Sequence, residues 1–149
     1  MFPAIFNIIA KVSAALGGAR ALGRDPHSVG ELSDAIAHGL PRAVVPALAA
    51  QAAPNRDGLR RRVAALVVSP ATYKRSRILS PAASERAERL ARITALAQQA
   101  FRNADKAREW LNAPHMLLAN QTPIETAATD LGARMVERVL TNIEYSLPV

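Results

Sequence analysis

Five residues in the middle of the chain have the types and spacing that suit contact with a polyanion. They are Thr72, Tyr73, Lys74, Arg75 and Arg77. Lysine and arginine neutralise phosphates and donate to guanine, and threonine contacts other base edges and thymine methyl groups. On a short helix such residues can enter the major groove of DNA, with Lys74 and Arg75 at phosphates or guanine. This stretch therefore predicts a nucleic-acid interface.

The positive charge of the chain is concentrated around these residues. The 149-residue sequence has a formal net charge of +7. Residues 56–92 contain ten lysine or arginine residues against three acidic ones, whereas residues 1–55 carry a net +1 and residues 93–149 a net −1. Local concentration of charge is the electrostatic signature of a polyanionic partner. An acidic protein partner is the alternative.

Two short helices are expected to present this interface as a helix-turn-helix. The buried face of the first is predicted from apolar residues at helical spacing, namely Leu59, Val63, Leu66 and Val67. Asp57 is a candidate cap for its start. Ser69-Pro70 is expected to begin the second helix after a turn at Val67 and Val68. Motifs of this kind usually read two half-sites as a pair, which predicts a homodimer.

A long helix is expected to follow, from Ser80-Pro81 to about Phe101. Small and apolar residues recur along it in steps of four and three and predict a seam for another helix, within the chain or across a dimer: Ala83, Ala87, Leu90, Thr94, Ala97 and Phe101. We expect Arg86, Arg89 and Arg92 on its outer, solvated face, with DNA contact as the alternative.

Closely spaced helix signals fill the last third of the chain. A short helix is expected over Asp105–Ala113, with Trp110 in the core and a contact with a partner protein as the alternative for that residue. Thr122 can cap a second one, and Thr129 a longer third one. The buried side of that third helix is predicted to comprise Leu131, Val136, Val139, Leu140 and Ile143.

This last third resembles the toxin-binding domain of the Xre/MbcA/ParS antitoxins. The resemblance is carried by Ala107, Trp110-Leu111, Pro114, Leu118, Thr122-Pro123-Ile124, Thr129, Gly132-Ala133-Arg134, Val136, Leu140 and Ile143-Glu144-Tyr145. It implies a RES-domain toxin as partner, an enzyme that attacks NAD or uses it to ADP-ribosylate a target. Ala119 and Asn120 stand where the family often has glycines.

The resemblance also implies which residues meet each partner. Such antitoxins block the NAD pocket of the toxin with their C-terminal region, so toxin contacts are expected at Arg134, Arg138, Glu144, Tyr145, Ser146, Leu147, Pro148 and Val149. For the two arginines, pairing with Glu137 or Glu144 is the alternative, and for the apolar tail residues it is fraying at a chain end. Family members commonly carry a Cro/CI-like helix-turn-helix upstream, which agrees with operator DNA as the second partner.

Catalytic and metal-binding patterns are not found in the sequence. His27, His38 and His115 are scattered, with no second ligand at metal spacing. Gly17-Gly18 is not followed by the lysine of a phosphate-binding loop. There is no cysteine, which suits a reducing cytoplasm. We therefore expect a cytoplasmic protein that has no cofactor and no metal and is not an enzyme.

An apolar stripe near the N-terminus has helical spacing and comprises Ile5, Ile8, Ile9, Val12 and Leu16. The run is shorter than the roughly 20 residues that a membrane span requires, and no basic leader precedes it. We expect this helix to pack on the domain or on a second copy of the chain, with a membrane anchor as the alternative.

The sequence thus predicts an all-α chain in three parts. Residues 1–40 form N-terminal helices that are candidates for dimerisation, residues 41–102 the helix-turn-helix and a long connecting helix, and residues 103–149 a small toxin-binding domain. The predicted function is that of a type II antitoxin that neutralises a RES-domain toxin and represses its own operon. A stand-alone transcription regulator and a helical adaptor protein are the alternatives.

Overall fold

The architecture is known from a computed structural model, which describes the backbone of residues 2–145 and the side chains of residues 8–145. Within that range every regular element is a helix, and the one extended pairing is an isolated antiparallel bridge between Pro41 and Ile78. The predicted all-α fold is confirmed. Among the described residues, no helix combines the length and apolar character needed to cross a membrane.

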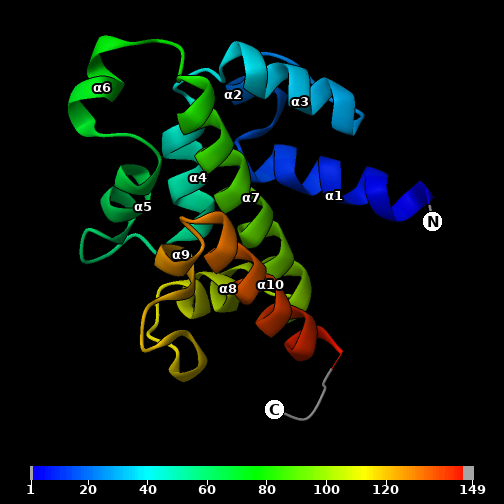
Figure 1. Cartoon of the computed structure of the whole chain (residues 1–149), viewed down its shortest axis with the longest axis vertical. Helices are drawn as coiled ribbons and strands as arrows, with labels where there is room; N and C mark the ends of the chain where they lie inside the picture. The colour runs from blue at the N-terminus through cyan, green and yellow to red at the C-terminus, as the bar shows by residue number, and fades with distance from the viewer. Residues whose placement is uncertain (1, 146–149) are drawn as a thin grey trace.

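The longest helix, α7, runs through the middle of the molecule and packs against α1, α3, α4, α5, α8 and α10 (Figure 1). In chain order the elements are α1 (Phe2–Ala15), α2 (Gly18–Leu22), α3 (Val29–His38), α4 (Val44–Ala52), α5 (Leu59–Val67), α6 (Pro70–Arg75), α7 (Pro81–Phe101), α8 (Ala104–Leu111), the 3-10 turn η1 (Met116–Leu118), α9 (Pro123–Thr126) and α10 (Asp130–Glu144). The α5–α6 pair lies on the opposite side of α7 from the C-terminal half of α10 (Figure 1).

Hydroxyl caps fix most of the helix starts that the sequence predicts. The side chains of Ser69, Ser80, Thr122 and Thr129 each accept a hydrogen bond from the backbone N–H three residues later. Each cap satisfies a donor that the first helical turn leaves unpaired. The predicted cap at Asp57 is wrong: Asp57 has a left-handed φ of 54°, and Gly58, at φ 69°, is the N-cap residue of α5.

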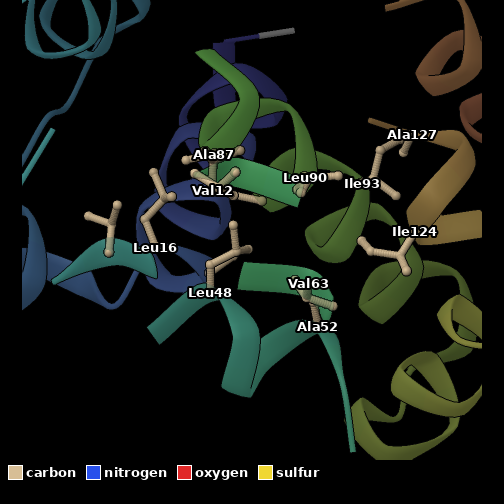
Figure 2. Close-up of a cluster of buried hydrophobic side chains, with 14 of the residues drawn as sticks. Val12, Leu16, Leu48, Ala52, Val63, Ala87, Leu90, Ile93, Ile124 and Ala127 are labelled. Atoms are coloured by element: carbon tan, nitrogen blue, oxygen red, sulfur yellow. The ribbon is translucent and has the colours of Figure 1, made fainter. Parts of the chain in front are cut away.

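One continuous apolar core joins the first helix to the last. Figure 2 shows Val12 and Leu16 of α1 facing Leu48 of α4 and Leu90 of α7, with Ile124 of α9 farther along the same cluster. Fully burying one such side chain stabilises the fold by about 1.5–3 kcal/mol. The N-terminal stripe is therefore confirmed as a face packed on the body of the chain at Ile9, Val12 and Leu16. The side chain of Ile5 lies outside the described residues.

The predicted seam of α7 is buried by helices of the same chain. Ala83, Ala87, Leu90, Thr94 and Ala97 are all buried, and Thr94 donates its hydroxyl hydrogen bond to the Leu90 carbonyl at 2.8 Å. Alanine at several of these positions lets neighbouring helices approach closely. As a result, α7 is a shared internal support for both ends of the molecule.

The arginines of α7 bind other elements of the chain, so the prediction that they form a solvated face is wrong. Arg86 donates through Nε to the carbonyl of Val67, the last residue of α5, at 3.0 Å. Arg89 donates to the Ala128 carbonyl at 2.9 Å, just beyond α9, and Arg92 to Glu137 Oε1 at 3.0 Å on α10. Helix ends supply unpaired carbonyls and partial negative charge, which arginine satisfies.

Glu88 beside this arginine row gives a pH-dependent prediction. Burial raises the pKa of Glu88, and the nearby Arg92 guanidinium opposes that shift only in part. A raised folded-state pKa contributes stability below the unfolded-state value of about 4.3, and the contribution is lost as the pH rises through the folded-state pKa. Glu88→Gln should therefore unfold at an equal or higher urea concentration than the parent at pH 7, with the difference shrinking towards pH 4. A loss of more than about 1 kcal/mol at pH 7 would mean that the Arg92 pairing dominates.

Candidate nucleic-acid interface and partner-binding face

The α5–α6 pair has the geometry of a helix-turn-helix. Val68 and Ser69 alone separate the two helices, and the buried side chains of Val67 and Val68 anchor the turn in the core. The Ser69 hydroxyl oxygen accepts from the Thr72 N–H at 3.2 Å, and Pro70 occupies the first helical position. These local signals begin α6 immediately after the turn, so α6 projects from the body with no buried residue of its own.

The structure brings the predicted DNA-binding residues to one exposed end of the molecule. Thr72, Lys74, Arg75 and Arg77 are exposed, whereas Tyr73 is half-buried. Helix α6 is shorter than predicted: it ends at Arg75, and Arg77 lies at a bend two residues beyond it. Thr72 Oγ1 also accepts from Arg75 Nη2 at 3.4 Å, which holds that guanidinium over the helix.

The sequence reasoning missed two cations that extend this surface. Arg61 and Arg62 on α5 are exposed, on the side of the helix away from the buried Val63 and Val67. The helical spacing that predicts a buried face at Val63 and Val67 also places Arg61 and Arg62 on the opposite, exposed face, so the sequence contained the information needed to identify them. We use the term cation cluster for the exposed set Arg61, Arg62, Lys74, Arg75 and Arg77.

The cation cluster lacks carboxylates to neutralise it. Residues 58–84 contain no aspartate or glutamate, and no member of the cluster forms an ion pair among the described residues. Other arginines of the chain are engaged: Arg56 pairs with Glu109 and Arg108 with Asp105. An uncompensated group of cations on one face attracts and binds phosphates.

Arg42 holds α6 against the body of the molecule. Its guanidinium lies over the Tyr73 ring, with Cζ 5.4 Å from the ring centroid, and Nη1 donates to the Tyr73 carbonyl at 3.3 Å. Its backbone N–H donates to the Arg77 carbonyl at 2.9 Å, beside the Pro41–Ile78 bridge. The orientation of α6 is thus held by Arg42 together with the half-buried Tyr73, which packs against the apolar core.

We predict that Arg42 positions the interface rather than binding phosphate. Arg42→Ala should weaken operator binding by about tenfold, because a cation–π contact and charged hydrogen bonds are lost. Arg42→Lys should weaken it almost as much, because lysine lacks the planar, multidentate guanidinium. Fluorescence anisotropy with operator DNA measures both. If Arg42→Lys binds like the wild type, the side chain acts only as a charge.

The C-terminal helices are fixed around Trp110 and the α7–α10 contact. Trp110 is half-buried and packs on the core, with its ring centroid 5.6 Å from that of Phe101. Gly132 lets α10 approach α9, because a Cβ at this position would overlap the Thr126 carbonyl oxygen. Ala119 and Asn120 have left-handed φ values of 56° and 62°, a conformation that glycine adopts at no steric cost.

The predicted partner-binding residues of α10 fall into two groups. Arg134 pairs with Asp130 at 2.9 Å, and Arg138 has no carboxylate partner among the described residues. Glu144 accepts from Gln99 Nε2 at 2.6 Å and so belongs to an internal contact with α7. The alternative pairing of the two arginines with Glu137 or Glu144 is therefore not observed. Tyr145 is exposed, and residues 146–149 lie outside the described part.

The prediction for the buried side of α10 is wrong at Leu131, which is 71% exposed. Val136 and Leu140 are buried as predicted, together with Ala133, whereas Val139 and Ile143 are half-buried. Leu131 lies five residues before Val136, which places it well around the helix from the packed face. The sequence signal that was missed is a second stripe, Leu131, Met135, Arg138 and Tyr145, with helical spacing of its own.

This second stripe borders a hollow that we call the α10 hollow. It has a volume of about 460 Å³ and is lined by Leu117 and Leu118 of η1 and by Leu131, Arg134, Met135, Arg138 and Val139 of α10. Met116, at 82% exposure, lies on the same 3-10 turn. Among the described residues, the hollow included, no group of three or more histidine, aspartate or glutamate side chains is arranged to hold a metal ion.

Two parts of the chain, one around the α5–α6 pair and one at the C-terminal helices, match known protein families. Residues 31–92, from α3 into α7, match the family model of the antitoxin Xre-like helix-turn-helix domain. Residues 96–145 match that of the antitoxin Xre/MbcA/ParS C-terminal toxin-binding domain. A protein named antitoxin Xre, from Pseudomonas putida, is 38% identical over 60 residues, which are 40% of this chain and 38% of that protein. The chain therefore has an antitoxin Xre-like helix-turn-helix domain followed by an antitoxin Xre/MbcA/ParS C-terminal toxin-binding domain.

Proposed function

We propose that this protein is the antitoxin of a type II toxin–antitoxin system, with a RES-domain, NAD-consuming toxin as its partner. It neutralises that toxin by direct binding through residues 103–149 and represses its own operon by binding DNA through residues 41–102. The role is binding rather than catalysis, and operator binding requires the compartment that holds the DNA, the cytoplasm.

The observation that supports this proposal is that two chemically different surfaces lie on one continuous apolar core. The cation cluster on and just after α5–α6 has no carboxylate partner in the part of the chain that the structure describes, which suits a nucleic acid. The α10 hollow is lined by five apolar side chains and by Arg134 and Arg138, which suits a protein. The toxin-binding family model covers the second surface, and the helix-turn-helix model covers the first.

For DNA we assign direct contact to Thr72, Lys74, Arg75 and Arg77, with Tyr73 as a partly buried member of the same helix. For the toxin we assign the residues Arg134, Arg138, Glu144, Tyr145, Ser146, Leu147, Pro148 and Val149. Operator reading by two half-sites makes a homodimer the expected form. The residues of the dimer contact are left unassigned.

Co-expression tests both parts of this proposal in one strain. We expect the neighbouring gene to encode the RES-domain toxin. Its product should arrest growth when expressed alone, and the protein should restore growth. A reporter driven by the promoter of the same operon should be repressed by the protein. Repression without rescue would indicate the stand-alone regulator, and rescue without repression would remove the DNA-binding role.

A further inference from the structure

Helix α10 has two faces with opposite surroundings. One face, with Ala133, Val136 and Leu140, is buried against α7 and the core. The other carries Leu131 and Met135, four residues apart, and both are exposed. Leaving large apolar side chains in water is unfavourable, and a contiguous group of them marks a surface that another molecule covers.

The exposed apolar residues of the chain gather at this face. Seven large apolar side chains are exposed among the described residues, and four of them lie on η1 or in the first two turns of α10: Met116, Leu117, Leu131 and Met135. Tyr145 continues the same stripe at the end of α10. Methionine side chains are flexible and polarisable, so they adapt to the shape of a bound partner.

The charges around the hollow define the chemistry of its occupant. Arg134 and Arg138 both line it. The partner of Arg134 is Asp130, and both of these side chains are more than half exposed, so the pair is easily exchanged. The acidic neighbours of Arg138 are engaged elsewhere, Glu137 by Arg92 and Glu144 by Gln99. Two guanidinium groups beside an apolar hollow favour a partner that offers carboxylates next to a large apolar side chain.

We propose that the α10 hollow is an anchoring contact for the toxin, which inserts a large apolar side chain between η1 and α10 and places acidic side chains against Arg134 and Arg138. This inference rests on the proposed function and adds the apolar side chains of η1 and α10 to the toxin contacts assigned there. A second copy of this chain fits less well, because across a two-fold axis it would bring the same two arginines to the contact.

The test uses the full chain and the purified product of the neighbouring gene, which the proposed function identifies as the RES-domain toxin. Leu131→Asp removes the apolar wall of the hollow, and an aspartate is well tolerated in the first turn of a helix, so α10 should still form. The matched control is Val29→Asp, another exposed apolar residue in a first helical turn, on α3. Arg138→Glu tests the charge without altering the apolar wall.

Leu131→Asp and Arg138→Glu should each raise the Kd for the toxin by about thirtyfold, as expected for a central interface residue. Val29→Asp should bind like the wild type, and all three variants should bind operator DNA unchanged. If the wild type and both hollow variants bind the toxin equally, the hollow is not the anchor although the proposed function stands. If the wild type binds no toxin, the proposed function fails and this inference with it. If Leu131→Asp instead changes the oligomeric state and leaves toxin binding intact, the face joins two copies of the chain and the inference is wrong.

Discussion

The double variant Lys74→Ala/Arg75→Ala should bind operator DNA with a log–log salt slope lower by about 1.8, because each phosphate contact contributes about 0.9. Its affinity should fall by about one to two orders of magnitude, since charged hydrogen bonds to phosphate or guanine are lost. Both side chains are exposed on a helix that buries none of its residues, so the fold should be unaffected. Anisotropy titrations at several salt concentrations measure the slope and the affinity together.

A second double variant, which removes two positive charges outside the cation cluster, provides the control. Arg20 and Arg24 are exposed, form no ion pair among the described residues and lie on or next to α2, outside the cation cluster. Arg20→Ala/Arg24→Ala removes the same two charges and should leave the salt slope unchanged. Toxin neutralisation should survive in both double variants. An unchanged slope for Lys74→Ala/Arg75→Ala would remove α6 from the DNA contact.

Removing Tyr145–Val149 should raise the Kd for the toxin by at least about tenfold, because the loss of one or two docked apolar side chains is of that size. The truncation leaves α10 complete, since the helix ends at Glu144, and it retains the hydrogen bond from Gln99 Nε2 to Glu144. The loss should therefore come from the toxin contact and not from unfolding. Calorimetric titration of the purified toxin measures it.

The same truncation has a direct consequence in cells. Growth rescue during co-expression with the toxin should weaken, while repression of the operon promoter should remain at the level of the full chain. Tyr145→Ala alone separates the exposed ring from the residues after it. Full rescue by the truncated chain would show that the tail has no part in neutralisation.

Local chemistry explains which parts of the fold were predictable. The starts of α6, α7, α9 and α10 each depend on one hydroxyl and the next few residues, all of which are adjacent in the sequence. The seam of α7 was predictable because helical spacing alone brings Ala83, Ala87 and Leu90 to one face. The start of α5 was not predictable from Asp57, because the backbone turns through left-handed conformations there.

The remaining differences depend on contacts between distant segments. The pairings of Arg86 with Val67, Arg89 with Ala128 and Arg92 with Glu137 span 19, 39 and 45 residues, so local spacing could not reveal them. The position of Arg42 over Tyr73 depends in the same way on the bridge between Pro41 and Ile78. Leu131 was assigned to the wrong face because two apolar stripes overlap on α10, and only packing shows which one is buried.

One complex formed in solution tests the central claim most directly. The protein should be co-expressed with the product of the neighbouring gene, which the proposed function identifies as a RES-domain toxin. That product should be purified through a tag and analysed by size-exclusion chromatography. The account predicts that the two proteins elute as one stable complex. In that complex α10 contacts the toxin, and the α5–α6 surface remains the site of operator binding. Elution of the two proteins as separate species, at concentrations well above micromolar, would contradict it.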